Sequence, residues 1–265
     1  MKKTIYLNIC DFIVRVVFLE TEQVIFQKEW IDFISKHWGR LVVKNNRKSI
    51  DYTITFADLD GGMKLFLQEK DGQYHKAIIK PKKNRVEIDY SAGLYLFNGV
   101  IRDAVADLVK DTGLLLHASG CVDKQGNLYI FTAVSGGGKS TTSKLLENMG
   151  WSHFSDDLIV IRKIGKVFRF YRPPFIEKEY GVLGGKFGGN KVSVLVVHKN
   201  EEKVRIEKMN NKVEILRVLI GGLRTLEARG VTKKELKLLS DLIDDQKFYN
   251  LYRNLSKNKL VRVFK

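Results

Sequence analysis

The sequence predicts an α/β protein of the α+β type, with a small β-rich N-terminal domain (residues 1–90) followed by a larger domain (residues 91–265) built on a mixed sheet. Three observations lead to this prediction. Apolar residues alternate in the first domain, which is the period of half-buried strands. Strands and helices then alternate irregularly, with turns too short for crossover connections. In the second domain, a glycine-rich loop separates a buried strand from a helix.

The N-terminal domain is expected to contain short strands and one helix. Strict alternation marks two strands, at Ile50, Tyr52, Ile54 and Phe56 and at Val86, Ile88 and Tyr90. Asp60-Gly61-Gly62 and Asp71-Gly72 are turn signals between strands. The helix carries Trp30, Ile31, Ile34 and Trp38 on one face and ends at Gly39. Both tryptophans are interpreted as core residues rather than as a ligand platform.

The larger domain opens with a helix from about Gly93 to Asp111, with Gly113 as its stop. Residues 114–116 and 128–132 flank a turn at 123–127, which predicts a hairpin.

A second hairpin is expected around Gly165, between residues 158–161 and 167–171, and a buried strand at 192–197. Helices are expected at 213–227 and 232–245, and the latter opens with the capping-box pattern Thr232 to Glu235.

One loop has the composition of a phosphate-binding P-loop, Ala133-Val134-Ser135-Gly136-Gly137-Gly138-Lys139-Ser140-Thr141. It follows the strand at 128–132 and precedes a helical pattern from Lys139 to Met149 that Gly150 ends. Glycines let successive backbone N–H groups converge on an anion, and the helix N-terminus adds a positive dipole. We therefore expect nucleotide binding by Ser135, Gly136, Gly137, Gly138, Lys139, Ser140 and Thr141.

Within this loop, Lys139 is expected to reach the β/γ-phosphates and the Ser140 hydroxyl to ligate Mg²⁺. Ala133 stands where the motif usually has its first glycine, and alanine fits there if its φ stays negative. A glycine-rich turn that merely contains Gly-Lys-Ser is the alternative, which the flanking strand and helix disfavour.

Two adjacent carboxylates follow the loop helix. Phosphoryl transfer needs one carboxylate for the metal and usually a second that accepts the hydroxyl proton. In an extended backbone Asp156 and Asp157 would point to opposite sides, so that one could hold Mg²⁺ while the other faces a substrate. An Asx turn before a strand explains the pair equally well.

A histidine and an arginine complete the set of candidates. His117 ends a strand, where a hydrogen-bonded core histidine is the more common outcome. Arg172 closes the second hairpin and could clamp a phosphate or an acidic substrate group. A solvated arginine on an edge strand is the alternative for Arg172.

The chain resembles a known family in the string His117-Ala-Ser-Gly, Gly126, Phe131, Ser135 to Thr141, Gly150, Ser155-Asp156-Asp157 and Pro174-Phe175. These residues resemble the catalytic domain of HPr serine kinase/phosphorylase, which shares a P-loop fold with ATP-dependent phosphoenolpyruvate carboxykinase. The chain is more similar still to HPr-kinase-like proteins encoded beside peptide-modification genes, among them kinases of lasso-peptide precursors. The resemblance covers residues 90–200 well.

The resemblance implies a role for each candidate. Asp156 would be the general base toward an acceptor hydroxyl, Asp157 would bind Mg²⁺ with Ser140, and His117 would orient the transferred phosphoryl group. The expected catalytic residues are thus Asp156, His117 and Lys139, and the expected metal ligands are Ser140 and Asp157. No match is found to the C-terminal signature loop of the bifunctional enzymes, so dephosphorylation and HPr as a substrate lack support. The glycine-dense stretch at 181–189 fits a lid over the site or a flexible connection equally well.

The composition favours a globular protein without a membrane span. Hydrophobic residues make up 44% and charged residues 29%, and no run of eighteen apolar residues occurs. The N-terminus lacks the pattern of a signal peptide, and Cys10 and Cys121 give neither a disulfide framework nor metal spacing. The expected location is the cytoplasm.

The net charge of +16 allows an anionic substrate, an acidic partner or a nucleic acid, or simply basic residues scattered over solvated faces. The basic runs at 80–85, 233–234 and 257–265 lack the interleaved aromatic residues that stack on bases, which disfavours nucleic acid.

The expected function is therefore a kinase that uses ATP and Mg²⁺ and phosphorylates a hydroxyl group, most simply a serine in a peptide, a protein or a small molecule. The alternative is a nucleotide-binding switch or ATPase module that serves a partner protein. A nucleic-acid-associated ATPase rests on charge alone. The donor (ATP, another nucleotide or pyrophosphate) and a homo-oligomeric state stay open.

Overall fold

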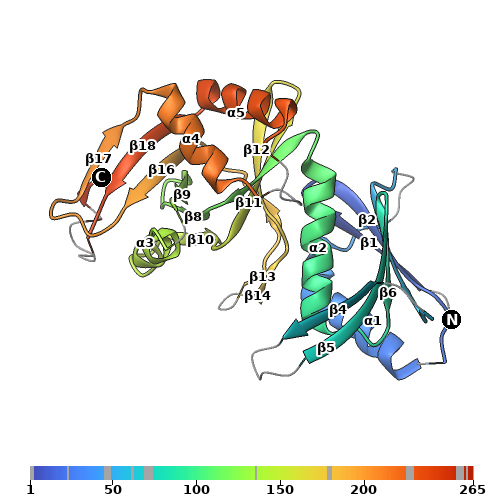
Figure 1. Cartoon of the computed structure of the whole chain (residues 1–265). Helices are drawn as coiled ribbons and strands as arrows, with labels where there is room; N and C mark the ends of the chain where they lie inside the picture. Colours follow the sequence, from blue (N-terminus) through green and yellow to red (C-terminus); the bar gives the residue numbers. More distant parts are fainter. Residues whose placement is uncertain are drawn as a thin grey trace. The chain divides into compact units, whose positions relative to one another are not determined.

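The computed structural model describes residues 3–22, 24–44, 49–60, 63–68, 74–134, 136–177, 181–224, 230–254, 260 and 262–264. The chain is a mixed α/β protein, as predicted, and divides into two compact units (Figure 1). Unit 1 is Met1–Leu108 with Pro173–Gly185, and unit 2 is Val109–Arg172 with Lys186–Lys265. The expected division between residues 90 and 91 stays a prediction. No helix in the described part has the length and apolarity needed to cross a membrane.

Unit 1 contains a six-stranded sheet among its described residues, in the order β1-β2-β3-β6-β5-β4. Its strands are β1 (Lys3–Ile9), β2 (Phe12–Phe18), β3 (Tyr52–Ala57), β4 (Met63–Gln68), β5 (Tyr74–Lys82) and β6 (Arg85–Asp89). The central strands β2, β3 and β6 run parallel, and the outer pairs are antiparallel. Tyr52, Ile54 and Phe56 are buried as their alternation predicts, whereas Ile50 precedes the strand and is exposed.

Two helices, α1 (Val24–Trp38) and α2 (Leu94–Val109), pack onto this sheet through an aromatic core, and a 3-10 turn (Gly39–Leu41) follows α1. Trp30 lies 4.8 Å from Phe56, and Trp38 lies 5.2 Å from Phe97, between ring centroids. The prediction that both tryptophans belong to the core is confirmed. The hairpin of β13 (Ile176–Glu177) and β14 (Gly181–Val182) also belongs to this unit, where the Trp38 indole donates to the Pro174 carbonyl at 3.0 Å.

Some turn predictions lie outside the described residues, namely Gly61-Gly62 and Asp71-Gly72. The strands beside the second turn, β4 and β5, pair antiparallel.

Gly113 is not the stop of the preceding helix, contrary to the prediction. The helix α2 ends at Val109, and Gly113 is the first residue of β7 (Gly113–His117). A Cβ on Gly113 would lie 2.6 Å from the carbonyl oxygen of Ile161. Glycine is therefore required here by the close approach of two strands.

The main sheet of unit 2 has six strands among the described residues, in the order β10-β8-β9-β16-β18-β17. They are β8 (Ser119–Val122), β9 (Leu128–Thr132), β10 (Ser152–Ser155), β16 (Val192–His198), β17 (Arg205–Lys208) and β18 (Lys247–Tyr252). The strands β9, β16 and β18 run parallel, so their carboxyl ends meet at one edge, while the other pairs are antiparallel. The sheet is mixed, as predicted.

A smaller sheet among the described residues has the order β15-β12-β11-β7, and its strands β7, β11 (Leu158–Ile164) and β12 (Val167–Arg172) belong to unit 2. The short strand β15 (Gly185–Lys186) stands where the chain passes from unit 1 to unit 2. The hairpin expected around Gly165 is confirmed as β11 and β12, with φ of 63° at the glycine.

The hairpin expected between residues 114–116 and 128–132 is wrong. The strand β7 pairs with β11, and the turn at 123–127 instead joins β8 to β9. The chain changes sheets at Ala118, whose N–H donates to the Asp157 carbonyl at 3.1 Å. The apolar strand at 114–116 thereby obtains a pairing partner from far along the chain.

Helices cover both faces of the main sheet (Figure 1). On one face Phe131 packs with Leu146 of α3 (Lys139–Glu147). On the other face Ile130 joins a cluster with Leu219 of α4 (Lys212–Gly222) and Leu242 of α5 (Lys233–Asp245). The alternation of side chains along β9 thus supplies both cores.

The two C-terminal helices differ in how well the sequence located them. The start of α5 has the predicted capping box, with reciprocal contacts between Thr232 and Glu235. The end of α4 was expected at residue 227, but the helix stops at Gly222 because Leu223 is extended and bridges Leu116. Residues 225–227 of the prediction lie outside the described chain.

The glycine-dense stretch at 181–189 contains two short strands, β14 and β15. Gly181 and Gly185 have positive φ, and a Cβ on Gly184 would lie 2.9 Å from the Leu41 side chain. Its two interpretations, a lid or a connection, stay predictions.

Candidate active site

The glycine loop (residues 133–141) begins directly after β9 and continues into the first turn of α3, at the edge where the parallel strands end. Gly136 and Gly138 have φ of 70° and 92°, which favours glycine strongly. A Cβ on Gly137 would lie 2.8 Å from the Val134 carbonyl oxygen. Ala133 does not have a positive φ, so the alanine in place of the usual glycine carries no strain. Ser135 lies outside the described residues.

Hydrogen bonds fix the start of α3. The Gly138 carbonyl accepts from the Thr142 N–H at 3.0 Å and from the Thr142 hydroxyl at 2.7 Å. The buried Ser143 hydroxyl donates to the Ser119 hydroxyl at 3.0 Å, which ties the helix to β8. The first N–H groups of a helix have no acceptor within the helix and carry its positive dipole. Together with the glycine loop, this helix end is suited to an anion.

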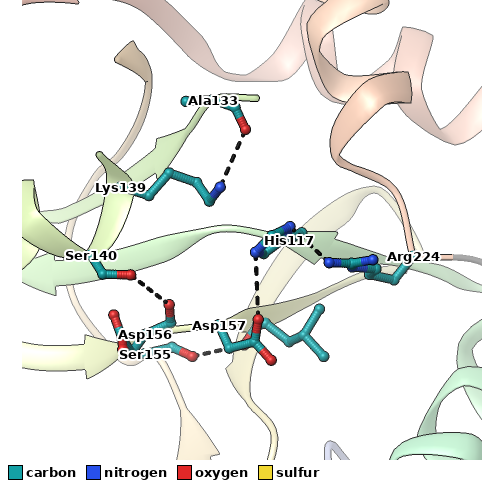
Figure 2. Close-up of polar contacts among 9 residues, drawn as sticks. His117, Ala133, Lys139, Ser140, Ser155, Asp156, Asp157 and Arg224 are labelled. Atoms are coloured by element: carbon teal, nitrogen blue, oxygen red, sulfur yellow. Dashed lines mark hydrogen bonds and ion pairs between the residues drawn. The ribbon is translucent and has the colours of Figure 1, made fainter. Parts of the chain in front are cut away.

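Lys139 is buried and folds back over the loop. Only 6% of the residue is exposed, and its ammonium donates to the Ala133 carbonyl at 3.3 Å (Figure 2). Burial lowers the pKa of Lys139, nearby Arg224 lowers it further, and Asp157 raises it. A bound anion would oppose the first two effects, because it favours the charged lysine.

The two aspartates stand in a bend between β10 and β11, not in the extended backbone assumed from the sequence. A register shift between His153 and Ser155 interrupts the pairing of β10, and the Ser155 hydroxyl donates to the Leu158 carbonyl at 2.7 Å. The Ser140 hydroxyl donates to the Asp156 carbonyl at 3.4 Å (Figure 2). The bend therefore brings the aspartates beside the first turn of α3.

His117 lies between Asp157 and Arg224, as Figure 2 shows. Its Nε2 lies 3.5 Å from Asp157 Oδ1, and its Nδ1 lies 3.1 Å from Arg224 Nη2. A guanidinium can only donate, so His117 Nδ1 must accept, which leaves the proton of the neutral ring on Nε2. Arg224 thus selects the tautomer that presents an N–H toward Asp157.

Arg224 was missed from the sequence. It stands two residues beyond α4, and its N–H donates to the Leu115 carbonyl at 2.8 Å, which fixes its backbone beside β7. No local motif marks it, because its position depends on the early end of α4 and on long-range pairing.

Two further cations contact the glycine loop and were also missed. Lys199 follows β16 and donates to the Gly136 carbonyl at 2.8 Å. Arg253 follows β18 and donates to the Gly138 carbonyl at 3.1 Å. Parallel strands that end at one edge are the signal that could have found them, but β18 itself was not singled out from the sequence.

The other expected site residues lie as follows. Thr141 is exposed in the first turn of α3. Arg172 is the last residue of β12 and is half-buried, and it is not among the residues in contact in Figure 2.

The residues present fit a magnesium ion that is held partly by a ligand. The described residues contain no group of three or more His, Cys, Asp or Glu side chains able to hold a metal alone. Mg²⁺ is usually held by one or two carboxylates together with phosphate oxygens and water. The Ser140 hydroxyl and the Asp157 carboxylate are oxygen donors of this kind.

Comparisons with known proteins add little to this geometry. No protein-family model matches the chain, and no curated protein does. Among solved structures, the Hpr(Ser) kinase/phosphatase from Coxiella burnetii is similar over 57% of this chain and 91% of its own, with 12% identity and a TM-score of 0.32. At that distance the likeness assigns neither an activity nor a ligand.

Proposed function

We propose that this protein is a Mg²⁺- and nucleotide-dependent kinase that phosphorylates a hydroxyl acceptor. One observation carries the proposal: Ser140, at the start of α3, contacts Asp156, the next residue Asp157 lies 3.5 Å from His117, and the buried Lys139 is close enough for Asp157 to raise its pKa. An anion-binding helix end beside two carboxylates and a histidine meets the needs of phosphoryl transfer.

The loop residues would hold the phosphates of the donor. The N–H groups at the start of α3, which have no acceptor within the helix, would donate to the phosphates, and the buried Lys139 supplies positive charge. The Ser140 hydroxyl and Asp157 would hold the Mg²⁺ ion, which, when bound, neutralises charge on the donor phosphates.

The proton-handling residues would be Asp156 and His117. Asp156 is exposed and would accept the proton of the acceptor hydroxyl. His117, with its Nδ1 held by Arg224, would present Nε2–H to the Asp157 carboxylate or to a phosphoryl oxygen. Arg224 would add a fixed positive charge beside Lys139.

A serine in a peptide or protein is the proposed acceptor, with free serine or a small hydroxyl compound as the other acceptors to test. This choice rests on the resemblance of the sequence to HPr-kinase-like proteins. A nucleotide-dependent switch is the rival, because the same loop serves that role. A switch has no need of a general base, so the exposed Asp156 beside the loop favours the kinase.

The test is to incubate the protein with labelled ATP and Mg²⁺ and with serine peptides, free serine, inositol or single-stranded DNA. We expect label on a serine peptide or on free serine, and none with Lys139→Ala, because the loop then lacks its buried cation. The control is Lys124→Ala, which removes a lysine from the turn between β8 and β9 and should leave the labelling unchanged. ATP hydrolysis that appears only with DNA and labels no acceptor would contradict the kinase.

A further inference from the structure

The glycine loop is supported by two cations from the strands beside it, Lys199 and Arg253. The three parallel strands β9, β16 and β18 end at one edge, where β9 leads into the loop. Lys199 and Arg253 each stand just beyond a neighbouring strand, and each donates to a loop carbonyl. Neither contact belongs to the phosphate-binding motif in the sequence.

The contact of Arg253 sets the direction of one N–H group. In a trans peptide the C=O of one residue and the N–H of the next point in opposite directions. Because Arg253 and Thr142 hold the Gly138 carbonyl, the N–H of Lys139 must point the other way. Gly138 has φ of 92°, and any side chain there would collide with the Arg253 guanidinium.

The contact of Lys199 supports the turn before it. It holds the Gly136 carbonyl at 2.8 Å, while the N–H of Gly137, in the same peptide unit, donates to the Val134 carbonyl at 2.9 Å. The two bonds hold opposite edges of one peptide group, because its C=O and N–H point in opposite directions within the plane. Rotation of this peptide plane would turn the Gly136 carbonyl oxygen toward a bound phosphate, and the bond from Lys199 opposes that rotation.

Arg253 is also a buried charge without a counter-ion in the described chain. The residue is 2% exposed, its Nε has no hydrogen-bond partner there, and its other donation goes to the Asn254 carbonyl at 3.4 Å. Two hydrogen bonds hold the backbone of Arg253 in place, because its N–H donates to the His198 carbonyl and its carbonyl accepts from the Glu201 N–H. A desolvated cation held in this way raises the local potential for an anion.

We infer that Lys199 and Arg253 are positioning residues of the phosphate-binding loop, which fix the orientation of its peptide planes and prepare it for the triphosphate of the donor. The inference rests on the proposed function. The two cations are inferred to act on the phosphate chain and not on the nucleoside, so their loss should weaken the binding of ATP and of inorganic triphosphate alike.

The experiment measures dissociation constants for Mg-ATP and for inorganic triphosphate by calorimetry. We expect Lys199→Met to weaken both ligands by roughly 10-fold and Arg253→Met by roughly 10- to 100-fold, the usual effect of losing a hydrogen bond from a charged donor. Arg205→Met is the matched control, because Arg205 stacks on Tyr252 at the same edge and pairs with Glu207.

Conservative variants separate positioning from folding. Lys199→Arg should restore most of the affinity for both ligands, and Arg253→Lys should give an intermediate loss with a thermal midpoint near that of the wild type. A further readout is the rate at saturating ATP, which should change less than the affinity in Lys199→Met.

Each other outcome has a defined meaning. Unchanged affinity in Lys199→Met and Arg253→Lys would overturn the inference and leave the proposed function intact. A loss confined to ATP, with triphosphate unaffected, would also overturn it, because the cations would then contact the nucleoside. A wild-type protein that binds neither ligand would overturn the proposed function and, with it, the inference.

Discussion

At the scale of single residues, Asp156 and Asp157 are neighbours with different surroundings. Asp156 is exposed, whereas Asp157 is half-buried and its Oδ1 lies 3.5 Å from His117 Nε2. The difference comes from the bend between β10 and β11 and not from the alternation of an extended strand. The two carboxylates can therefore serve different roles for a reason that the sequence did not supply.

We predict that substitution separates these roles. Asp157→Asn should mainly weaken metal-dependent nucleotide binding, because a carboxylate oxygen is lost from the proposed Mg²⁺ site. Asp156→Asn should leave binding nearly intact and slow the chemical step by roughly 10²–10⁴-fold, the usual effect of a general base. Calorimetry with Mg-ATP and single-turnover kinetics would measure the two effects, and equal loss of affinity in both variants would contradict the assignment.

Lys139 yields a second prediction at this scale. Lys139→Met should abolish phosphoryl transfer and weaken Mg-ATP binding, while the fold should remain, because methionine fills a similar volume without the buried charge. Removing a desolvated cation should even leave the thermal midpoint unchanged or slightly raised. Calorimetry and thermal unfolding would check this, and a Lys139→Met protein with full ATP turnover would refute the role of the loop.

At the scale of elements, α4 offers two adjacent glycines with different environments. A Cβ on Gly221 would meet nothing within 4 Å, whereas one on Gly222 would lie 3.0 Å from the Leu116 side chain and 3.3 Å from the Thr132 hydroxyl. The end of this helix is therefore packed closely against β7 and β9, just before Arg224.

We predict different stabilities for the two alanine variants. Gly221→Ala should stabilise the protein by about 0.5–1 kcal/mol through helix propensity alone. Gly222→Ala should be less stable than Gly221→Ala, because the helix gain is offset by crowding against Leu116. Chemical denaturation of both variants measures the difference, and equal stabilisation would show that the helix end can shift freely.

The capping box of α5 gives a further prediction. Thr232 accepts from the Glu235 N–H at 3.1 Å, and the Glu235 side chain accepts from the Thr232 N–H at 2.8 Å. Thr232→Ala should therefore cost about 1 kcal/mol of stability, since the Glu235 N–H in the first turn loses its hydroxyl acceptor. Lys233→Ala, at the next and exposed position, is the control, and similar losses in both variants would argue against the cap.

At the scale of the whole molecule, each unit contains a tyrosine whose pKa is raised. Burial and the nearby Asp107 and Asp103 raise the pKa of Tyr52 in unit 1 to about 12. Burial and Asp123 raise the pKa of Tyr129 in unit 2 to about 12. Both groups therefore hold their protons in the folded state at a pH where the unfolded chain has released them.

This difference predicts a loss of stability in alkali. The contribution of each tyrosine is fully present below its ordinary pKa of about 10 and is lost as the pH rises from about 10 to about 12. The stability lost over this interval should be smaller in Tyr129→Phe and in Tyr52→Phe than in the wild type. Denaturation between pH 8 and pH 12 measures this, and parallel pH profiles for wild type and variants would contradict it.

The sequence by itself determined the features that depend on neighbouring residues. The alternation at Tyr52, Ile54 and Phe56, the capping box of α5 and the strand–loop–helix order around Lys139 all follow from local spacing, and the structure has each of them. A mixed main sheet was predicted too, but the antiparallel partner of β9 is β8 and not the strand at 114–116 that the prediction used.

The tertiary structure alone decided the features that depend on distant pairing. The strand β7 pairs with β11 rather than with β9, and this places Ala118 against the Asp157 carbonyl. Arg224, Lys199 and Arg253 reach the site because long-range strand contacts hold the chain where each of them stands. Local spacing fixes which residues share a face or a turn, but the cations around the glycine loop come from three separate places in the chain, and only the packing of the sheet brings them together.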